Sequence, residues 1–325
     1  MKAMVVQSPG APFELVEVSR PEPRVGEALV RIHASGVNPL DIMIRARKAA
    51  HARQPLPAIL GIDLAGTVEA VSPGVTSLQP GDEVFGMTGG VGGIPGSLAE
   101  FAAVDARLLA RKPANVSMRE AAALPLIFIT AWEGLVDRVA LRAGQNLLVL
   151  GGGGVATMAI QLARGLGATV YCAVSPSKTD TLRGYGAVPV DLAATTLDEV
   201  IAVRTDGQGF DVVYDTLGGS SLDIAFNAVK RFGHVVSCLG WGTHALSTLS
   251  FKAASYSGVF TLLPLLTGEG REHHGQILHA AAHLVETGKL RALLDSRTFT
   301  LQTVAEAHEL TGQRKAQGKL VVEIG

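Results

Sequence analysis

The stretch Leu147-Leu148-Val149-Leu150-Gly151-Gly152-Gly153-Gly154-Val155-Ala156 predicts a strand, a tight glycine turn and the start of a helix. A short apolar run is typical of a buried strand, and the apolar spacing that continues to Leu166 is typical of a helix. In the pattern G-x-G-x-x-A, Gly151 makes the turn, Gly153 lets the backbone approach a pyrophosphate, and Ala156 lets the helix pack on the strand. The first N–H groups of the helix then bind the anion, although a flexible loop is the alternative. The candidate cofactor-binding residues of this turn are Gly151, Gly152, Gly153, Gly154, Val155 and Ala156.

The sequence around this turn, from Met118 onward, repeats the alternation of strands and helices. Further strands are expected at residues 169–174, 188–190, 211–214 and 234–239, with a sixth at 258–263. Strands that alternate with helix-length patterns predict a parallel sheet with helices on both faces. We therefore expect a doubly wound Rossmann domain over residues 118–263.

The remaining sequence has a different pattern. Up to about residue 115 it consists of short apolar or alternating runs broken by Gly and Pro, which predicts irregular β structure. Helices are expected at residues 275–287 and 304–310, and the run 319–324 is expected to be a strand that returns to the first domain. The second domain is therefore predicted to comprise residues 1–117 and 264–325.

The residues after the second Rossmann strand indicate which nicotinamide cofactor is preferred. An NAD site usually places an acidic residue there to bind the ribose 2′-hydroxyl. This chain instead has Ser175, Ser177 and Lys178, whose hydroxyls and ammonium suit a 2′-phosphate, so NADPH is predicted over NADH. The alternative is that Ser-Pro-Ser caps the next helix and that Lys178 is a solvated side chain.

Two further segments follow strands at the carboxyl edge of the predicted sheet, where a doubly wound sheet binds its ligand. Thr216 follows the fourth strand, and Leu239 with Gly240 follows the fifth. We expect these residues to line the nicotinamide pocket, with ordinary loop structure as the alternative.

Composition excludes several other classes of protein. The chain has 325 residues and a formal net charge of -1, so it lacks the basic excess of a nucleic-acid or polybasic membrane surface. Two cysteines, Cys172 and Cys238, cannot build a disulfide framework and are interpreted as buried thiols in a reducing, cytoplasmic setting. The longest apolar stretch, around residues 121–132, is shorter than the roughly 20 residues that a membrane span needs.

Several motifs together resemble the medium-chain dehydrogenase/reductases, and most closely their zinc-independent quinone oxidoreductase-like branch. Besides the glycine turn, the resemblance rests on residues 34–41, 61–68, 81–86, 124–125, 130–132, 288–291 and 318–321, and it covers essentially the whole chain. It implies an α/β fold with a GroES-like β-rich catalytic domain and a Rossmann domain, with the substrate entering between them. It also implies NADPH-dependent reduction of quinones or α,β-unsaturated carbonyls.

The same resemblance makes a catalytic zinc ion unexpected. Zinc alcohol dehydrogenases of the superfamily have Cys where this chain has Asn38, and Gly-His-Glu where it has residues 61–63, Gly-Ile-Asp. No cysteine precedes Cys172, so a thiolate zinc site cannot form in the first domain. A simple carbonyl needs a Lewis acid to stabilise the developing alkoxide, whereas a conjugated acceptor spreads its own negative charge. No metal ligands are therefore predicted.

The candidate catalytic residues are Asn38 and Thr130. Asn38 is expected to donate a hydrogen bond to the substrate oxygen or the nicotinamide, or else to cap the helix that starts at Pro39. The resemblance places Thr130 beside the nicotinamide ribose, with a buried helix threonine as the alternative. Many relatives have a Tyr where this chain has Met43, so solvent is the expected proton donor. Asp63 is expected to form an ion pair within its domain.

Two other features have a simpler interpretation. His279 and His283 have metal-ligand spacing on a helix, but a solvated helix face is the favoured interpretation. The glycine-rich segment 86–96 is interpreted as a mobile flap.

The hypothesis from the sequence is a cytoplasmic NADPH-dependent oxidoreductase that acts on a small conjugated carbonyl or quinone. It is expected to bind neither nucleic acid nor membrane, and the resemblance implies a homodimer that forms through residues 258–263. Three alternatives stay open: a non-catalytic NADPH-binding sensor or structural protein, a zinc alcohol dehydrogenase, and an enoyl-thioester reductase.

Overall fold

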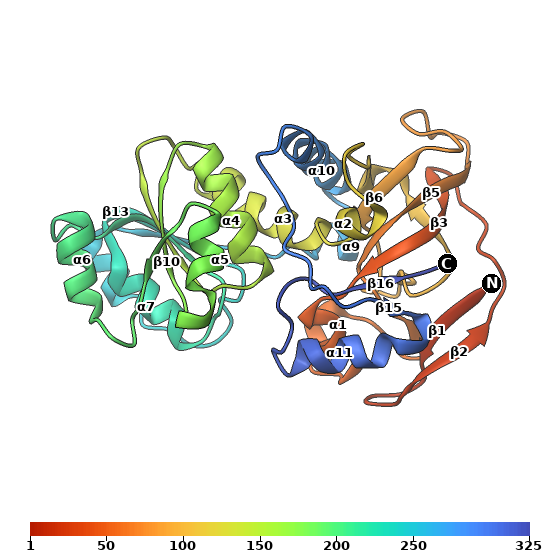
Figure 1. The fold of residues 1–325 in the computed structure, drawn as a ribbon, viewed down its shortest axis with the longest axis horizontal. Coiled ribbons are helices and arrows are strands. Elements are labelled where there is room, and N and C mark those ends of the chain that lie inside the picture. Colours follow the sequence, from red (N-terminus) through yellow and green to blue (C-terminus); the bar gives the residue numbers. More distant parts are fainter. The chain divides into compact units, whose positions relative to one another are not determined.

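The computed structural model describes residues 1–325, and the chain divides into two compact units. The first comprises Met1–Ile129 and Leu262–Gly325, and the second comprises Thr130–Thr261. Figure 1 shows both units with their helices and strands. No helix in either unit has the length and apolar character needed to cross a bilayer.

A six-stranded parallel sheet forms the centre of the second unit, in the order β11-β10-β9-β12-β13-β14. This is the strand order 3-2-1-4-5-6 of a doubly wound dinucleotide-binding sheet, with the topological switch between β9 and β12. The Rossmann prediction is therefore confirmed. The strands are β9 (Asn146–Leu150), β10 (Thr169–Ala173), β11 (Val188–Val190), β12 (Phe210–Asp215), β13 (Val229–Ser237) and β14 (Ser255–Gly258).

The sixth strand lies earlier in the sequence than predicted. β14 ends at Gly258, and after one more hydrogen bond, from Val259 N to Ser237 O at 2.9 Å, the chain leaves the sheet. The apolar residues that follow lead into helix α9, which begins at Leu263 with a proline in its first turn. The prediction of a strand at residues 258–263 is therefore wrong, because this apolar run leads into a helix that has Pro264 in its first turn.

Helices flank this sheet and supply the other half of its core. The strand residues Leu148 and Val213 are fully buried, as expected for strands covered on both faces, and they pack with Phe226 of α7. The helical elements are the π-helix η3 (Glu133–Arg138), α4 (Gly154–Gly165), the 3₁₀ helix η4 (Pro176–Lys178), α5 (Thr179–Gly184), α6 (Leu197–Thr205), α7 (Ser220–Ala228) and α8 (Ser247–Lys252).

The first unit is built on β sheets, as the short alternating runs predict. A seven-stranded sheet has the order β15-β16-β3-β5-β6-β8, with β7 pairing β3, and a smaller sheet has the order β2-β1-β4. Its last strand, β16, pairs antiparallel with β3, so the predicted return of the C-terminal strand to the N-terminal segment is confirmed. The strands are β1 (Lys2–Val6), β2 (Phe13–Glu17), β3 (Glu27–Gly36), β4 (Ala58–Ile59), β5 (Asp63–Val71), β6 (Glu83–Met87), β7 (Phe101–Asp105), β8 (Leu109–Arg111), β15 (Phe299–Thr300) and β16 (Val321–Glu323).

The helices of the first unit include both of those predicted near the C-terminus. They are α10 (Arg271–Glu286) and α11 (Val304–Gly312). Helix α3 begins in the first unit and ends in the second. The other helical elements are α1 (Pro39–Arg45), α2 (Met118–Ala122), α3 (Pro125–Trp132), α9 (Leu263–Thr267), and the 3₁₀ helices η1 (Ala50–Ala52), η2 (Ala106–Leu108) and η5 (Leu301–Thr303).

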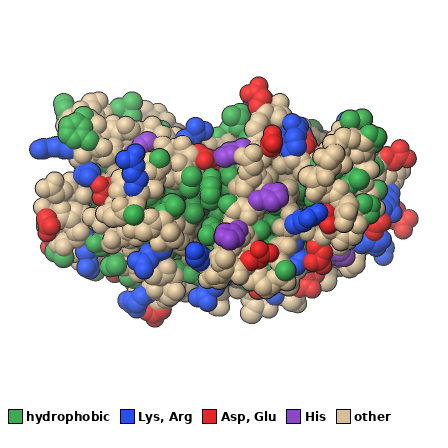
Figure 2. All heavy atoms as spheres, turned by 90° about the horizontal axis from the view of Figure 1, so that it is seen from above, with side chains coloured by type: hydrophobic (Ala, Val, Ile, Leu, Met, Phe, Trp, Pro, Cys, Tyr) green, Lys and Arg blue, Asp and Glu red, His purple; other side chains and the backbone are tan.

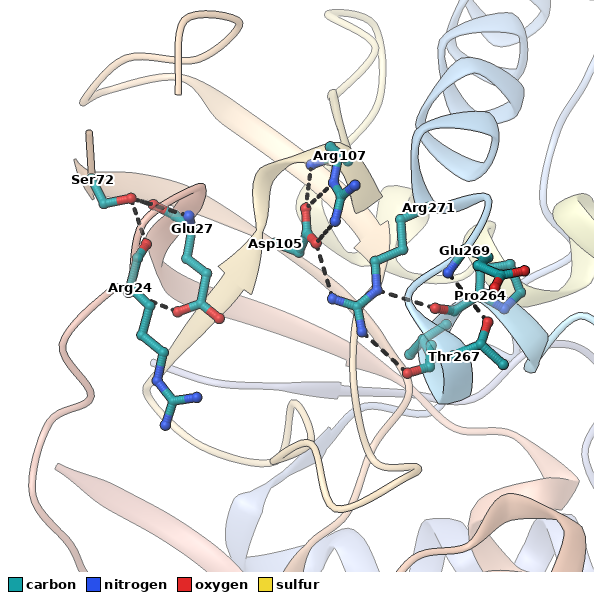
Figure 3. A network of polar contacts seen from close by, with 10 residues as sticks. Arg24, Glu27, Ser72, Asp105, Arg107, Pro264, Thr267, Glu269 and Arg271 are labelled. Carbon is teal, nitrogen blue, oxygen red and sulfur yellow. Dashed lines mark hydrogen bonds and ion pairs between the residues drawn. The ribbon is translucent and has the colours of Figure 1, made fainter. Parts of the chain in front are cut away.

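One arginine ties the C-terminal segment of this unit to its N-terminal segment (Figure 3). Arg271, at the start of α10, donates to Asp105 Oδ2 at 2.9 Å and to the carbonyl oxygens of Pro264 and Leu265 at 3.1 and 3.2 Å. Asp105 also binds the guanidinium of Arg107. The guanidinium therefore holds α9 and α10 against the end of β7.

The glycine-rich segment 86–96 is tied into the first unit, which contradicts its interpretation as a mobile flap. Gly90 N binds Ile94 O at 3.0 Å, Gly92 N binds Ala52 O at 2.9 Å, and Gly96 N binds Ile59 O at 2.9 Å. A Cβ atom at Gly96 would lie 2.3 Å from the backbone of Leu60. The glycines are therefore needed for close packing of backbone on backbone rather than for motion.

Candidate functional site

The glycine turn after β9 has the geometry expected of a phosphate-binding turn. Gly151 has φ +114°, and a Cβ atom there would lie 2.5 Å from Thr216 Oγ1, so the turn requires glycine. Gly153 is the residue before α4, is exposed, and has no atom within 4 Å of the position of a Cβ. This open space lies at the N-terminus of α4, where N–H groups have no partner within the helix. Ala156 is fully buried against the sheet.

The segment after β10 lies against this turn. Lys178 Nζ donates to the carbonyl oxygen of Gly152 at 2.9 Å, and the hydroxyl oxygens of Ser175 and Ser177 are 3.2 Å apart. All three side chains are exposed. The structure thus brings the ammonium and two hydroxyls to the edge of the glycine turn. The Ser175 side chain makes no capping hydrogen bond to the short helix η4 that follows it.

Asp215 organises the loops that follow β12 and β13, and sequence reasoning missed it. Its buried carboxylate accepts hydrogen bonds from Leu217 N at 3.1 Å, from Gly218 N at 3.1 and 3.2 Å, and from Ser237 Oγ at 2.7 Å. Ser237 Oγ in turn accepts from Leu239 N at 3.1 Å. The signal in the sequence is an acidic residue that ends an apolar run three residues before Gly218 and Gly219.

The predicted pocket residues Thr216, Leu239 and Gly240 lie at this same edge of the sheet. Thr216 Oγ1 donates to Leu150 O, the last residue of β9, at 2.8 Å. A Cβ at Gly218 would lie 2.5 Å from Leu239 O, so the two loops are in close contact. A Cβ at Gly240 would overlap the hydroxyl of Tyr256. The structure therefore brings these residues together with the glycine turn.

Thr130 lies in the second unit and is in contact with the buried Tyr214. Tyr214 Oη donates to Thr130 O at 2.7 Å, and Thr261 Oγ1 lies 3.1 Å from Thr130 Oγ1 and 2.6 Å from Glu133 Oε2. Burial raises the pKa of Tyr214 well above its usual value, so it stays a neutral hydrogen-bond donor. The backbone of α3 at Thr130 is thereby fixed to β12.

Asn38 lies in a buried cluster of charged side chains in the first unit. Its Nδ2 donates to Asp63 Oδ2 at 2.9 Å, and its Oδ1 accepts from Lys319 Nζ. Lys319 Nζ also lies 3.3 Å from Asp63 Oδ2, which confirms the predicted ion pair of Asp63 within its domain. Asn38 N donates to Asp41 Oδ2 at 2.8 Å, so Asn38 also takes its alternative role, the N-cap of α1. Both polar atoms of the Asn38 side-chain amide therefore have hydrogen-bond partners within the protein.

Burial is the main cause of the raised pKa values of the Asp41 and Asp63 carboxyl groups. It raises the pKa of Asp41 to about 7, and the neighbouring Asp63 adds to this effect. Asp41 Oδ1 is buried and has no hydrogen-bond partner. Burial also raises the pKa of Asp63, although Lys319 and Asn38 oppose this by stabilising its charged form.

No three His, Cys, Asp or Glu side chains in the chain lie close enough together to hold a metal ion. His279 and His283 are exposed on α10, and His279 Nδ1 lies 2.7 Å from Gly275 O. Figure 2 shows separate histidine side chains and interspersed positive and negative charges on the face that it draws.

Cys172 is buried beside the glycine turn, with its Sγ 3.2 Å from Gly151 O, and burial raises the pKa of its thiol to about 12.

Two family models match the chain. The alcohol dehydrogenase GroES-like domain matches residues 24–114, and the zinc-binding dehydrogenase family matches residues 186–322.

Several curated proteins are similar over nearly the whole chain. A 2-methylene-furan-3-one reductase of Solanum lycopersicum is 34% identical over 94% of this chain and 74% of its own length. A chloroplastic NADPH-dependent alkenal/one oxidoreductase of Arabidopsis thaliana is 34% identical over 93% and 73%. A protein of the spectinabilin polyketide synthase system of Streptomyces orinoci is 34% identical over 91% of this chain, which spans only 13% of that protein.

Solved structures share the whole fold. An alcohol dehydrogenase superfamily protein from Novosphingobium aromaticivorans is 55% identical, with a TM-score of 0.98 over 100% of both chains. The quinone oxidoreductase from Coxiella burnetii is 27% identical, with a TM-score of 0.84 over 100% of this chain and 99% of that one.

Proposed function

Because the chain belongs to the medium-chain dehydrogenase/reductase superfamily and is an oxidoreductase of its enoyl- and quinone-reductase type, we propose that it is an NADPH-dependent reductase. Its proposed reaction is hydride transfer to quinones or α,β-unsaturated carbonyls without catalytic zinc. Enzymes of this superfamily that act as reductases bind nicotinamide cofactors. The substrate class, the preference for NADPH and the independence of zinc are our proposals.

The observation that carries the proposal is the position of Lys319. Its ammonium group contacts Asn38 and Asp63, the residues that stand where zinc alcohol dehydrogenases have Cys and Glu. The position of the zinc-binding His is occupied by Ile62, which is fully buried. Zinc prefers thiolate and imidazole ligands, and this position offers an amide, an alkyl side chain and a carboxylate that already pairs with the ammonium group of Lys319. These residues are therefore poorly suited to bind zinc.

Without zinc at this position, the proposed substrates are hydride acceptors that delocalise the negative charge formed in the reaction. When bound, NADPH supplies a hydride, which forms a new C–H bond at the β-carbon of an enone while the electron pair of the double bond moves toward the carbonyl oxygen. Hydrogen-bond donors suffice to hold the resulting enolate, and a proton from solvent completes the α-carbon. Met43 is half exposed and has no acidic group, in agreement with a proton from solvent.

Two features of the second unit support the proposal that it binds NADPH. The open space beside Gly153 at the start of α4 suits a pyrophosphate, and the exposed groups of Ser175, Ser177 and Lys178 suit a 2′-phosphate. We propose Thr130, Thr216, Leu239 and Gly240 for the nicotinamide half. The engaged amide of Asn38 makes it a positioning residue in this proposal rather than a donor to substrate. The GroES-like unit is the proposed catalytic domain.

The proposal is tested by following NADPH oxidation with a panel of enones, enals and quinones, each beside its saturated carbonyl analogue. We expect turnover of conjugated acceptors only, faster with NADPH than with NADH, and unchanged after dialysis against a chelator. Stoichiometric zinc in the purified protein, together with turnover of saturated ketones, would support a zinc alcohol dehydrogenase instead.

A second candidate substrate class is the enoyl thioester. It is favoured by the similarity to the polyketide synthase protein and by that to the CurK enoyl reductase, which is 26% identical with a TM-score of 0.86. A crotonyl thioester compared with the matching enone distinguishes the two classes by kcat/KM. The homodimer through residues 258–263, of which only Gly258 lies in the edge strand β14, and the cytoplasmic location stay predictions. Light scattering tests the first of these.

A further inference from the structure

The buried ion pair of the first unit contacts the helix that carries Thr130. Asp63 is the first residue of β5 and is fully buried. One carboxylate oxygen, Oδ1, accepts from Leu126 N at 2.9 Å, and the other accepts from Asn38 Nδ2 and faces Lys319 Nζ. Both carboxylate oxygens of Asp63 therefore accept hydrogen bonds, and Oδ1 accepts from the backbone of α3.

Leu126 N is the first backbone donor of α3, because Pro125 has no N–H. The first N–H groups of a helix have no partner within it, and a carboxylate there is favoured by the helix dipole. Asp63 therefore fixes the N-terminal end of α3 to β5. Thr130 follows four residues later in the same helix.

Lys319 makes this carboxylate tolerable in the interior. Burying a charge costs much free energy unless it is paired, and the Lys319 side chain is itself only 7% exposed. Lys319 comes from the C-terminal segment, which binds the N-terminal segment through Val37 N and Leu320 O at 2.9 Å. The cluster thus joins β5, α1, α3 and the C-terminal segment.

We propose that Asp63 and Lys319 are positioning residues for hydride transfer: they hold the start of α3, and through this helix Thr130, in place for the nicotinamide half of the cofactor. The cluster that replaces the zinc ligands thereby acts on the reaction without contacting the reacting atoms. This inference rests on the proposed function only through the role of Thr130.

Two double variants separate the helix cap from the charge. Lys319→Met with Asp63→Asn removes both charges but leaves an amide oxygen that accepts from Leu126 N. Asn38, released from Lys319, is then free to turn its own amide oxygen toward the new amide. Lys319→Met with Asp63→Ala removes the same charges and also the acceptor. The matched control is Arg271→Met with Asp105→Ala, which removes a partly buried ion pair of the same unit (Figure 3).

Three readouts test the inference: kcat with a conjugated acceptor, the NADPH dissociation constant, and hydrogen exchange of a peptide that covers α3. For the alanine double variant we expect faster exchange in α3 and a kcat lower by about tenfold to a hundredfold, with NADPH affinity largely kept. The asparagine double variant should recover most of the lost rate and protection. The control should keep both, even where it lowers the melting temperature.

Equal kcat and equal α3 exchange in the two Asp63 double variants, corrected for folded fraction, would overturn the inference. Absence of turnover in the wild-type protein would instead contradict the proposed function. In that case the α3 exchange and the fluorescence of bound NADPH still decide between the two double variants.

Discussion

Lys178 Nζ lies 2.9 Å from the carbonyl oxygen of Gly152, so the cation that follows β10 is held against the glycine turn. Replacing Lys178 with Ala should weaken NADPH binding by about tenfold, because a charge-assisted hydrogen bond to the 2′-phosphate is lost, and should leave NADH binding unchanged. Calorimetric titration with both cofactors measures this ratio. Arg183→Ala, an exposed cation on α5 that pairs with Asp180, is the control. No loss for either cofactor would assign Lys178 to the solvated surface, and equal loss for NADPH and NADH would assign its effect to the contact with Gly152 rather than to the 2′-phosphate.

A substitution at Gly153 is expected to weaken cofactor binding without affecting folding. A methyl group there meets no protein atom within 4 Å and φ is -86°, so Gly153→Ala should fold normally. The same methyl group occupies the space proposed for the pyrophosphate, so the affinity for NADPH should fall at least about tenfold. Gly165→Ala in the same helix, also without a neighbour within 4 Å, should keep full affinity. Normal NADPH binding by the Gly153 variant would place the pyrophosphate elsewhere.

The Rossmann sheet could be predicted from the sequence because each of its central strands is a short apolar run buried on both faces. The strands predicted at 169–174, 188–190 and 211–214 agree with β10, β11 and β12 to within a residue at each end. The start of β13 does not follow from the sequence, because Lys230 and Arg231 interrupt the apolar run, Phe232 is exposed with φ +59°, and the pairing with β12 is irregular there.

The buried cluster of the first unit could be predicted only in part. An ion pair for Asp63 was expected, but its partner lies 256 residues away in sequence, and only the pairing of β16 with β3 brings Lys319 to it. The glycine-rich segment 86–96 was misread because glycine permits either motion or close backbone packing, and composition alone does not distinguish them. The contacts of Gly96 decide for packing.

Asp215 is expected to stabilise both loops at the carboxyl edge of the sheet. Asp215→Ala leaves the buried Ser237 hydroxyl and Gly218 N without their acceptor, which should lower the free energy of unfolding by about 3 kcal/mol. Asp215→Asn keeps one acceptor oxygen and should lose less. Urea unfolding of the two variants measures the difference. A destabilisation equal to that of Ser237→Ala would show that the contacts with the loop after β12 contribute nothing.

The raised pKa of Asp41 predicts that part of the stability is lost as pH rises. Its ordinary value is 3.8 and burial raises it to about 7, so the folded protein keeps a proton that the unfolded chain releases. The stabilising effect of this proton is full below pH 3.8 and is lost as pH rises through about 7. The stability of the wild-type protein relative to Asp41→Asn should therefore fall between pH 4 and pH 8, as measured by urea unfolding.

Asp295 provides the control of opposite sign. Its hydrogen bonds from Arg297 hold its pKa well below the ordinary value of 3.8, so its contribution is present above pH 3.8 and is lost at lower pH. The stability of the wild-type protein relative to Asp295→Asn should not change between pH 5 and pH 8. A flat difference for Asp41→Asn over the same range would contradict the protonated state of Asp41.

The central claim is that hydride reaches the β-carbon of a conjugated acceptor without help from a metal ion. It is tested most directly by incubating the metal-free protein with NADPH deuterated at C4 of the nicotinamide and an enone, and locating the label in the product by NMR. The account predicts a saturated ketone that carries deuterium at the β-carbon. An allylic alcohol with deuterium on the carbinol carbon, or the absence of any product until zinc is added to the metal-free protein, would contradict it.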